Sequence, residues 1–187
     1  MGQLDGRVAL ITGASSGLGA HFAEIFAREG AKVVIGARRI DRIEALAGRI
    51  GAAALPVALD VTDEASIAAA YDAAEAQFGT VDTVIANAGQ SNAGRATDVP
   101  ADELRSTIDV NFTGVLLTAR EGARRLMAAG SRETGRGRIV MIGSITAHLT
   151  GQGDSAYAAS KAAVAHLVTT LSVLQPQAAK VLQAVEA

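Results

Sequence analysis

Short apolar runs alternate along the chain with longer segments whose apolar residues recur at helical spacing. We predict strands for the apolar runs at residues 7–12, 32–37, 54–59, 81–86 and 138–143. We predict helices at 17–29, 40–50, 63–78, 101–129 and 155–174, with a bend in the fourth near Gly114. Strands that alternate with helices in this way form a parallel sheet, because each crossover is right-handed and places a helix on a face of the sheet. The pattern therefore predicts a doubly wound α/β sheet with helices on both faces.

The segments that follow the first, fourth and fifth predicted strands are polar or contain glycines. They span residues 13–19, 87–94 and 144–154. Ligands of open parallel sheets bind beyond the carboxyl ends of the strands. These three segments are therefore the candidate binding site.

The first of these segments completes the run Thr-Gly-Ala-Ser-Ser-Gly-Leu-Gly at residues 12–19, between a strand and a helix. The first amides of a helix lack intrahelical partners, and the helix dipole favours an anion beside them. The glycine spacing, G-x3-G-x-G, differs from the more familiar G-x-G-x-x-G, and glycine turns also join strands to helices where no ligand binds. The position between strand and helix favours a dinucleotide pyrophosphate site formed by Gly13, Ser15, Ser16, Gly17, Leu18 and Gly19.

The end of the second strand distinguishes between the two nicotinamide dinucleotides. NAD sites place an acidic residue there to accept from the ribose hydroxyl, whereas this chain reads Gly36-Ala37-Arg38-Arg39. An arginine can instead pair with a 2′-phosphate, so Arg38 predicts NADP(H) in preference to NAD(H). The alternative is a solvated basic face, but positive charge at a helix N-terminus opposes the dipole.

Two further segments offer contacts to a nucleotide. Asp60, followed by Val61, can accept from an adenine amino group, although a cap for the next helix is the favoured interpretation of Asp60. The small residues of Asn87-Ala88-Gly89 let the backbone lie close to a nucleotide, and a simple turn containing asparagine is the alternative.

Tyr157 and Lys161 stand four residues apart in a predicted helix and therefore on one face of it. An ammonium group near a phenol stabilises the phenolate, which is the adjustment that general acid–base catalysis by tyrosine requires. Ser144, at the end of the fifth strand, can face the same cleft. A tyrosine–lysine pair alone is usually structural, but beside a dinucleotide turn and Ser144 it indicates catalysis.

Composition excludes several classes of function. The 187 residues carry a net charge of −2, which offers no electrostatic basis for binding nucleic acid or an anionic membrane. The absence of cysteine excludes disulfides and thiolate chemistry. We predict no metal site, and neither a signal peptide nor a membrane-spanning run is apparent, so the expected location is cytoplasmic.

These residues together resemble the short-chain dehydrogenase/reductase family over about residues 4–174. The resemblance implies a Rossmann-type sheet in the order 3-2-1-4-5 and hydride transfer between a nicotinamide and a small-molecule carbonyl or alcohol. It implies that Tyr157 is the general acid/base, that Ser144 binds the substrate oxygen, and that Lys161 binds the nicotinamide ribose and favours the phenolate. It also implies that Asn111 positions a water, that Ala37-Arg38 marks the branch preferring NADP, and that the chain forms a homo-oligomer.

After residue 174 the chain departs from the family pattern. We expect one domain over residues 1–187 with a divergent helical tail at 175–187, and without the usual sixth and seventh strands. Strand 138–143 would then be an open edge unless the tail or a partner covers it. Three functions remain open: an NADP-dependent oxidoreductase, a dinucleotide-binding protein without turnover, and a structural or interaction module.

Overall fold

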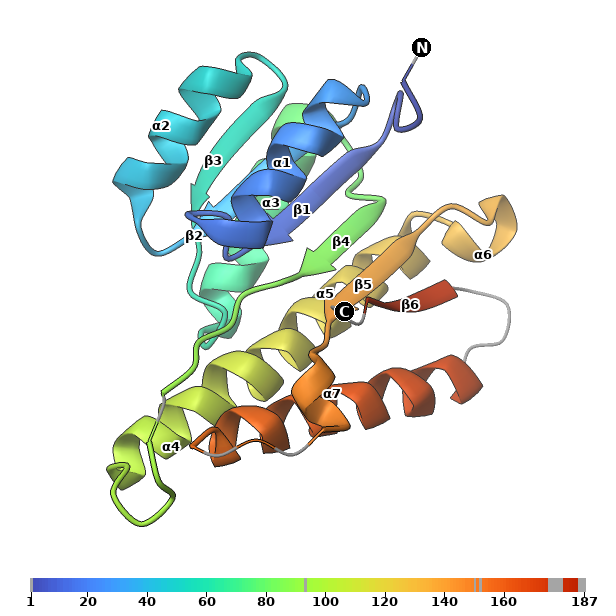
Figure 1. Cartoon of the computed structure of the whole chain (residues 1–187). Coiled ribbons are helices and arrows are strands. Elements are labelled where there is room, and N and C mark those ends of the chain that lie inside the picture. Colours follow the sequence, from blue (N-terminus) through green and yellow to red (C-terminus); the bar gives the residue numbers. More distant parts are fainter. Residues whose placement is uncertain (1, 93, 150, 152, 175–179, 185–187) are drawn as a thin grey trace.

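The computed structural model describes residues 2–92, 94–149, 151, 153–174 and 180–184 (Figure 1). The strands are β1 (Val8–Thr12), β2 (Lys32–Ala37), β3 (Ala54–Ala58), β4 (Thr83–Ala86), β5 (Arg138–Ile142) and β6 (Lys180–Ala184). The α-helices are α1 (Gly17–Arg28), α2 (Ile40–Ile50), α3 (Glu64–Phe78), α4 (Ala101–Ile108), α5 (Gly114–Ala128), α6 (Ser131–Thr134) and α7 (Ser155–Leu174). A π-helix, η1 (Asp109–Thr113), joins α4 to α5, and a 3₁₀ turn, η2 (Ile145–Ala147), follows β5.

The sheet is parallel, with strand order β3-β2-β1-β4-β5-β6. The predicted order of the first five strands is confirmed. The prediction that a sixth strand is absent is wrong, because β6 pairs with β5 in register from Arg138↔Lys180 to Ile142↔Ala184. The helical tail is likewise wrong over residues 180–184, while residues 175–179 and 185–187 of that prediction lie outside the described residues. The backbone of β5 is therefore paired on both sides.

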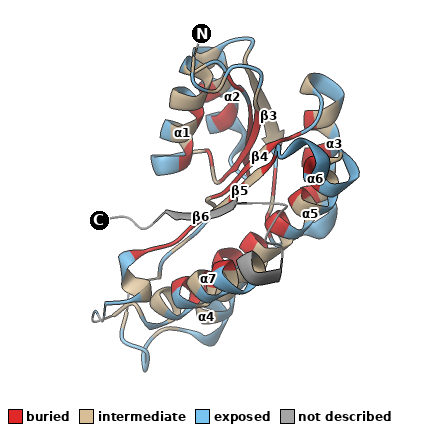
Figure 2. Ribbon diagram, turned by 90° about the vertical axis from the view of Figure 1, so that its right-hand side faces the viewer, coloured by how far each residue is buried: buried red, intermediate tan, exposed pale blue. Residues whose placement is uncertain are grey.

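Alternate residues of each central strand face opposite layers of helices. In β1, Leu10 belongs to a core cluster that includes residues of α3, α5 and α7, whereas Ile11 belongs to one that includes residues of α1 and α2. The two layers lie on either side of the sheet in Figure 1, and Figure 2 shows buried positions along the strands and on the inner sides of the helices. This two-sided burial explains why the strands read as continuous apolar runs.

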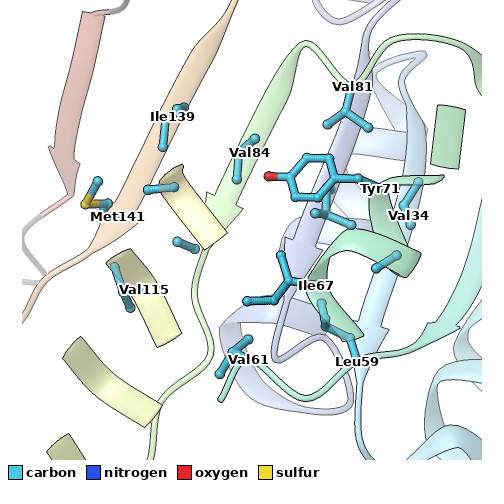
Figure 3. Close-up of a cluster of buried hydrophobic side chains, with 14 of the residues drawn as sticks. Val34, Leu59, Val61, Ile67, Tyr71, Val81, Val84, Val115, Ile139 and Met141 are labelled. Atoms are coloured by element: carbon cyan, nitrogen blue, oxygen red, sulfur yellow. The ribbon is translucent and has the colours of Figure 1, made fainter. Parts of the chain in front are cut away.

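The larger core cluster has Tyr71 of α3 near its centre, beside Val81 and Val84 (Figure 3). The Tyr71 hydroxyl donates to the backbone oxygen of Thr118 in α5 at 3.1 Å, so the buried phenol is satisfied. Gly122 makes room for it, since a Cβ there would lie 2.6 Å from the tyrosine oxygen. Burial raises the pKa of Tyr71 above its ordinary value, and the phenol is neutral.

Arg125 of α5 binds two carboxylates of α3, Asp72 and Glu75, and one of its own helix, Glu121. Its guanidinium lies 2.8 Å from Asp72, 2.7 Å from Glu75 and 2.8 Å from Glu121, and it stands over the ring of Tyr71. Burial alone lowers the pKa of Arg125, but hydrogen bonds to these carboxylates outweigh it and raise that pKa.

The predicted helix over 101–129 is interrupted in the structure just before Gly114. Five residues of π-helix separate α4 from α5, and Asn111 lies within them. Gly114 lets the next helix approach the loop after β3, because a Cβ there would lie 2.6 Å from Val61. Single-turn π-helices often occur at functional sites because they change the direction of one side chain. Across the described part of the chain, no helix has both the length and the apolar character that crossing a membrane requires.

Candidate functional site

The turn after β1 brings the backbone very close to the loop after β4. Gly13 has a φ of +68°, and a Cβ on it would lie 2.8 Å from the Cα of Ala88. Gly19, in the first turn of α1, is equally confined, because a Cβ there would lie 2.6 Å from the oxygen of Gly13. Glycine is therefore required at both positions.

Thr12 fastens these two segments together. Its hydroxyl oxygen accepts hydrogen bonds from the backbone amides of Asn87 and Ala88, each at 3.0 Å. The Asn87 side-chain amide in turn donates to the backbone oxygen of Thr12 at 2.9 Å. The ends of β1 and β4 are therefore held at one edge of the sheet.

Arg39 reaches back from the end of β2 to the glycine turn. Its Nε and Nη2 donate to the Ser15 hydroxyl at 3.1 and 2.7 Å, and Nη2 also donates to Ser16 at 2.8 Å. Ser16 is the N-cap of α1, yet its side chain makes no capping hydrogen bond. A guanidinium cannot accept, so both serine hydroxyls accept from Arg39 and keep their protons for another acceptor. The result is a cluster of hydrogen-bond donors at a helix N-terminus, a donor set that suits phosphate oxygens.

A first cavity of about 360 Å³ lies over the carboxyl ends of β1 to β4. Most of the residues predicted to bind the cofactor line this cavity, as do Arg39 and Gln90. The lining residues from the prediction are Gly13, Ser15, Ser16, Leu18, Arg38, Asp60, Val61, Asn87, Ala88 and Gly89. Gly17 and Gly19 do not line this cavity; Gly17 supplies a left-handed backbone with a φ of +56°, and Gly19 supplies close packing.

Asp60 lines the first cavity and does not cap α3. Its carboxylate accepts from the backbone amide of Thr62 at 3.0 Å and from the Thr62 hydroxyl at 2.7 Å, while Asp63 caps the helix. The interpretation of Asp60 as the helix cap is therefore wrong. The two hydrogen bonds from Thr62, the backbone bond first, hold the pKa of Asp60 below its ordinary value.

A second cavity of about 280 Å³ adjoins the first, since Leu18, Asn87, Gly89 and Gln90 line both. Tyr157 and Lys161 line this second cavity, as do Ile142 and Gly143 at the end of β5. The Lys161 Nζ lies 5.7 Å from the centre of the Tyr157 ring and donates to the backbone oxygen of Ile142 at 2.8 Å. The lysine is 4% exposed, so its ammonium is held in place between α7 and β5.

Ser144 and Asn111 stand just behind the lining of the second cavity. Ser144 follows Gly143 directly and is buried, and its hydroxyl oxygen accepts from the amide and the hydroxyl of Thr146 at 3.2 and 2.9 Å. Its own proton remains for another acceptor. Asn111 is fully buried, and its amide joins Gln90 of the β4 loop to Ser160 of α7.

The structure thus places most of the predicted cofactor residues around one cavity, and Tyr157 with Lys161 at the next. The sequence analysis assigned no role to three residues of this site: Arg39, Gln90, which lies within the candidate segment 87–94, and Ser160. The pair Arg38-Arg39 was a visible signal for the first, but the sequence cannot tell which arginine turns back to the serines. No spacing in the sequence indicates Gln90 or Ser160.

Comparison with known proteins agrees with this arrangement. Residues 7–181 match the family described as short chain dehydrogenase. A protein of Sinomonas cyclohexanicum, named cis-4-hydroxycyclohexanecarboxylate dehydrogenase, is 40% identical over 174 residues, which cover 89% of this chain and 66% of that protein.

Two solved structures have the same fold. The 3-ketoacyl-(acyl-carrier-protein) reductase of Brucella melitensis, complexed with NADH, superposes with a TM-score of 0.91 at 36% identity, covering 98% of this chain and 77% of that one. A short chain dehydrogenase/reductase of Burkholderia phymatum, in complex with NAD, gives a TM-score of 0.91 at 30% identity, covering 99% of this chain and 66% of that one. The chain therefore spans about two thirds to three quarters of the length of these three proteins. From its parallel sheet, its glycine turn and the match over residues 7–181, the chain belongs to the short chain dehydrogenase family.

Proposed function

We propose that this chain carries the nucleotide site and the proton-transfer site of an NADP-dependent oxidoreductase acting on a small carbonyl or alcohol. The observation that supports this most is the meeting of two cavities, one with a donor-rich turn and one with Tyr157 and Lys161. One relative is named as a dehydrogenase of a hydroxycyclohexanecarboxylate. Two solved structures contain NADH or NAD, and one of these proteins is named as a ketoacyl reductase.

In this proposal the first cavity holds the adenosine and pyrophosphate. The Ser15 and Ser16 hydroxyls and the first amides of α1 donate to phosphate oxygens. Asp60 and Val61 lie by the adenine, and Arg38 pairs with a 2′-phosphate. The preference for NADP(H) over NAD(H) rests on Ala37 and Arg38, because no carboxylate stands at the end of β2 to accept from a ribose hydroxyl.

A nicotinamide bound in the second cavity, with its ribose held by Lys161, would supply or accept the hydride, and the chain's own residues would transfer the proton. During reduction the Tyr157 hydroxyl donates its proton to the carbonyl oxygen, and during oxidation the phenolate takes that proton back. Lys161 favours the phenolate through its charge. The Ser144 hydroxyl donates to the substrate oxygen, and the water that the family resemblance assigns to Asn111 stays a prediction.

The test is NADPH oxidation that depends on an added carbonyl, followed by the absorbance of the reduced nicotinamide. The panel includes cyclohexanone carboxylates and a 3-ketoacyl thioester, the chemistry named for the relatives. Tyr157→Phe should abolish turnover while its dissociation constant for NADPH stays within about twofold of the wild-type value. A wild-type rate in Tyr157→Phe would show that the tyrosine is not the acid.

The same measurements separate the alternatives. A protein that binds NADPH but turns over no carbonyl is a dinucleotide-binding protein, and one that binds no NADPH is a structural or interaction module. We further propose a homo-oligomer that uses the α4–α5 and α7 helices, which light scattering of the purified chain tests.

A further inference from the structure

One buried hydroxyl beside the second cavity has no part in the proton transfer described above. Ser160 stands in α7 between Tyr157 and Lys161, and it is 0% exposed. A buried hydroxyl normally has hydrogen-bond partners, and those partners show what it holds.

The direction of each hydrogen bond around Ser160 is fixed by its neighbours. The backbone oxygen of Gln90 accepts from Asn111 Nδ2 at 2.8 Å, and the backbone amide of Gln90 donates to Asn111 Oδ1 at 2.8 Å. A carbonyl can only accept and an amide can only donate, so the Asn111 side chain has a single orientation. Its second Nδ2 proton then points at Ser160 Oγ, 3.1 Å away.

Ser160 must therefore accept from Asn111, and its only proton goes elsewhere. It donates to the backbone oxygen of Tyr157 at 2.6 Å. These hydrogen bonds form a continuous series from the Gln90 backbone through the Asn111 and Ser160 side chains to the Tyr157 backbone. They connect the loop after β4, the π-helix η1 and the first turn of α7.

Both ends of this connection lie at the proposed site. Gln90 lines the two cavities, and Tyr157 lines the second. Tyr157 is the third residue of α7, where backbone amides lack intrahelical partners and helix ends fray. Ser160, three residues further along α7, accepts from Asn111 and donates to the Tyr157 backbone oxygen, so its hydroxyl ties this end of the helix to the protein interior.

We propose that Ser160 is a positioning residue, whose hydroxyl keeps the first turn of α7 in register with the Gln90 loop and so places Tyr157 opposite the substrate. This inference rests on the proposed function, because the position of Tyr157 matters only if Tyr157 transfers the proton. Ser160 itself contacts neither substrate nor cofactor in this proposal.

The test compares wild type, Ser160→Ala and Ser160→Cys in the full chain. The matched control is Thr170→Ala, which removes an exposed hydroxyl of α7 that donates to the His166 backbone oxygen at 3.0 Å. Ser160→Ala should lower kcat about tenfold, move the pH profile of kcat, and leave the NADPH dissociation constant within about twofold. Ser160→Cys, whose sulfur donates and accepts weakly at similar volume, should give an intermediate kcat. Thr170→Ala should match wild type.

A second readout needs no turnover. The Gln90 amide donates to Asn111, so its hydrogen exchange should quicken about tenfold in Ser160→Ala and remain unchanged in Thr170→Ala. Unchanged Gln90 exchange together with unchanged kcat would overturn the inference. An equal loss of kcat and NADPH affinity would also overturn it, because the hydroxyl would then support the whole cavity wall. If wild type reduces no carbonyl, the proposed function fails, and the Gln90 exchange still decides whether Ser160 couples the two segments.

Discussion

Asn87 donates two hydrogen bonds to Thr12, one from its backbone amide to the Thr12 hydroxyl oxygen at 3.0 Å and one from its side-chain amide to the Thr12 backbone oxygen at 2.9 Å. The same hydroxyl also accepts from the Ala88 amide. This pair aligns the two loops whose separation defines the first cavity. Thr12 does not line the first cavity, but its hydrogen bonds hold the loops that do.

Thr12→Val keeps the shape of the side chain but removes the acceptor for two amides. We expect it to lower the free energy of unfolding by about 1–3 kcal/mol, because buried donors left without partners lose their hydration. Urea unfolding measures this. Thr12→Ser retains the hydroxyl and should lose less than Thr12→Val; equal losses from both would mean that the hydrogen bonds contribute little.

Arg38 and Arg39 are predicted to act on different parts of the cofactor. Arg38→Ala should weaken NADPH binding about tenfold to a hundredfold and NADH binding little, because only NADPH carries the phosphate that a free guanidinium would pair with. Arg39→Ala should weaken both cofactors to a similar extent, since Arg39 bonds to Ser15 and Ser16 at the glycine turn. Fluorescence titration of each variant with each cofactor provides the four dissociation constants. Equal losses for NADPH and NADH in Arg38→Ala would contradict the assignment.

Arg125→Met should destabilise the protein by about 2–4 kcal/mol, because it leaves Asp72, Glu75 and Glu121 together without their shared cation. Arg120→Met is the control, since it breaks one exposed ion pair with Glu64 and should cost less than about 1 kcal/mol. Urea unfolding at neutral pH compares the two variants, and equal losses of stability would argue against a cooperative network.

Asp60→Asn tests the pH dependence that the structure assigns to one carboxylate. The bonds from Thr62 hold the folded-state pKa of Asp60 below its ordinary value, so its stabilising contribution is present above about pH 4 and is lost as the pH falls through that lowered value. Wild type should therefore be more stable than Asp60→Asn at neutral pH, and the gap should narrow in acid. The free energy of unfolding of both proteins is measured across this pH range. A difference between them that does not change with pH would show that the ionisation of Asp60 does not contribute to stability.

The positions of the first five strands were predictable because the central strands are continuous apolar runs buried on both faces, whereas their order came from the family resemblance. The glycine turn and the residues around it were predictable for a related reason: their positions follow from strand ends, which a parallel sheet collects at one edge.

The remaining features depend on contacts that the sequence does not encode locally. The tail has apolar residues at helical spacing, but residues 180–184 pair with β5, because the unpaired edge of a buried strand offers hydrogen bonds that outweigh local preference. The π-helix has no periodic signature, so the burial of Asn111 was not predictable. The sequence also does not show that the Arg39 side chain turns towards Ser15 and Ser16, because these serines lie more than twenty residues away in the chain.

Gly13 and Ala88 show what sets the depth of the first cavity. Their main chains approach so closely that a single added carbon would collide with Ala88. The floor of the site is thus made of backbone in contact with backbone, whereas its walls are side chains such as Arg38 and Leu18. Substitutions at Arg38 or Leu18 would therefore alter the walls, whereas any side chain added at Gly13 would collide with the floor itself.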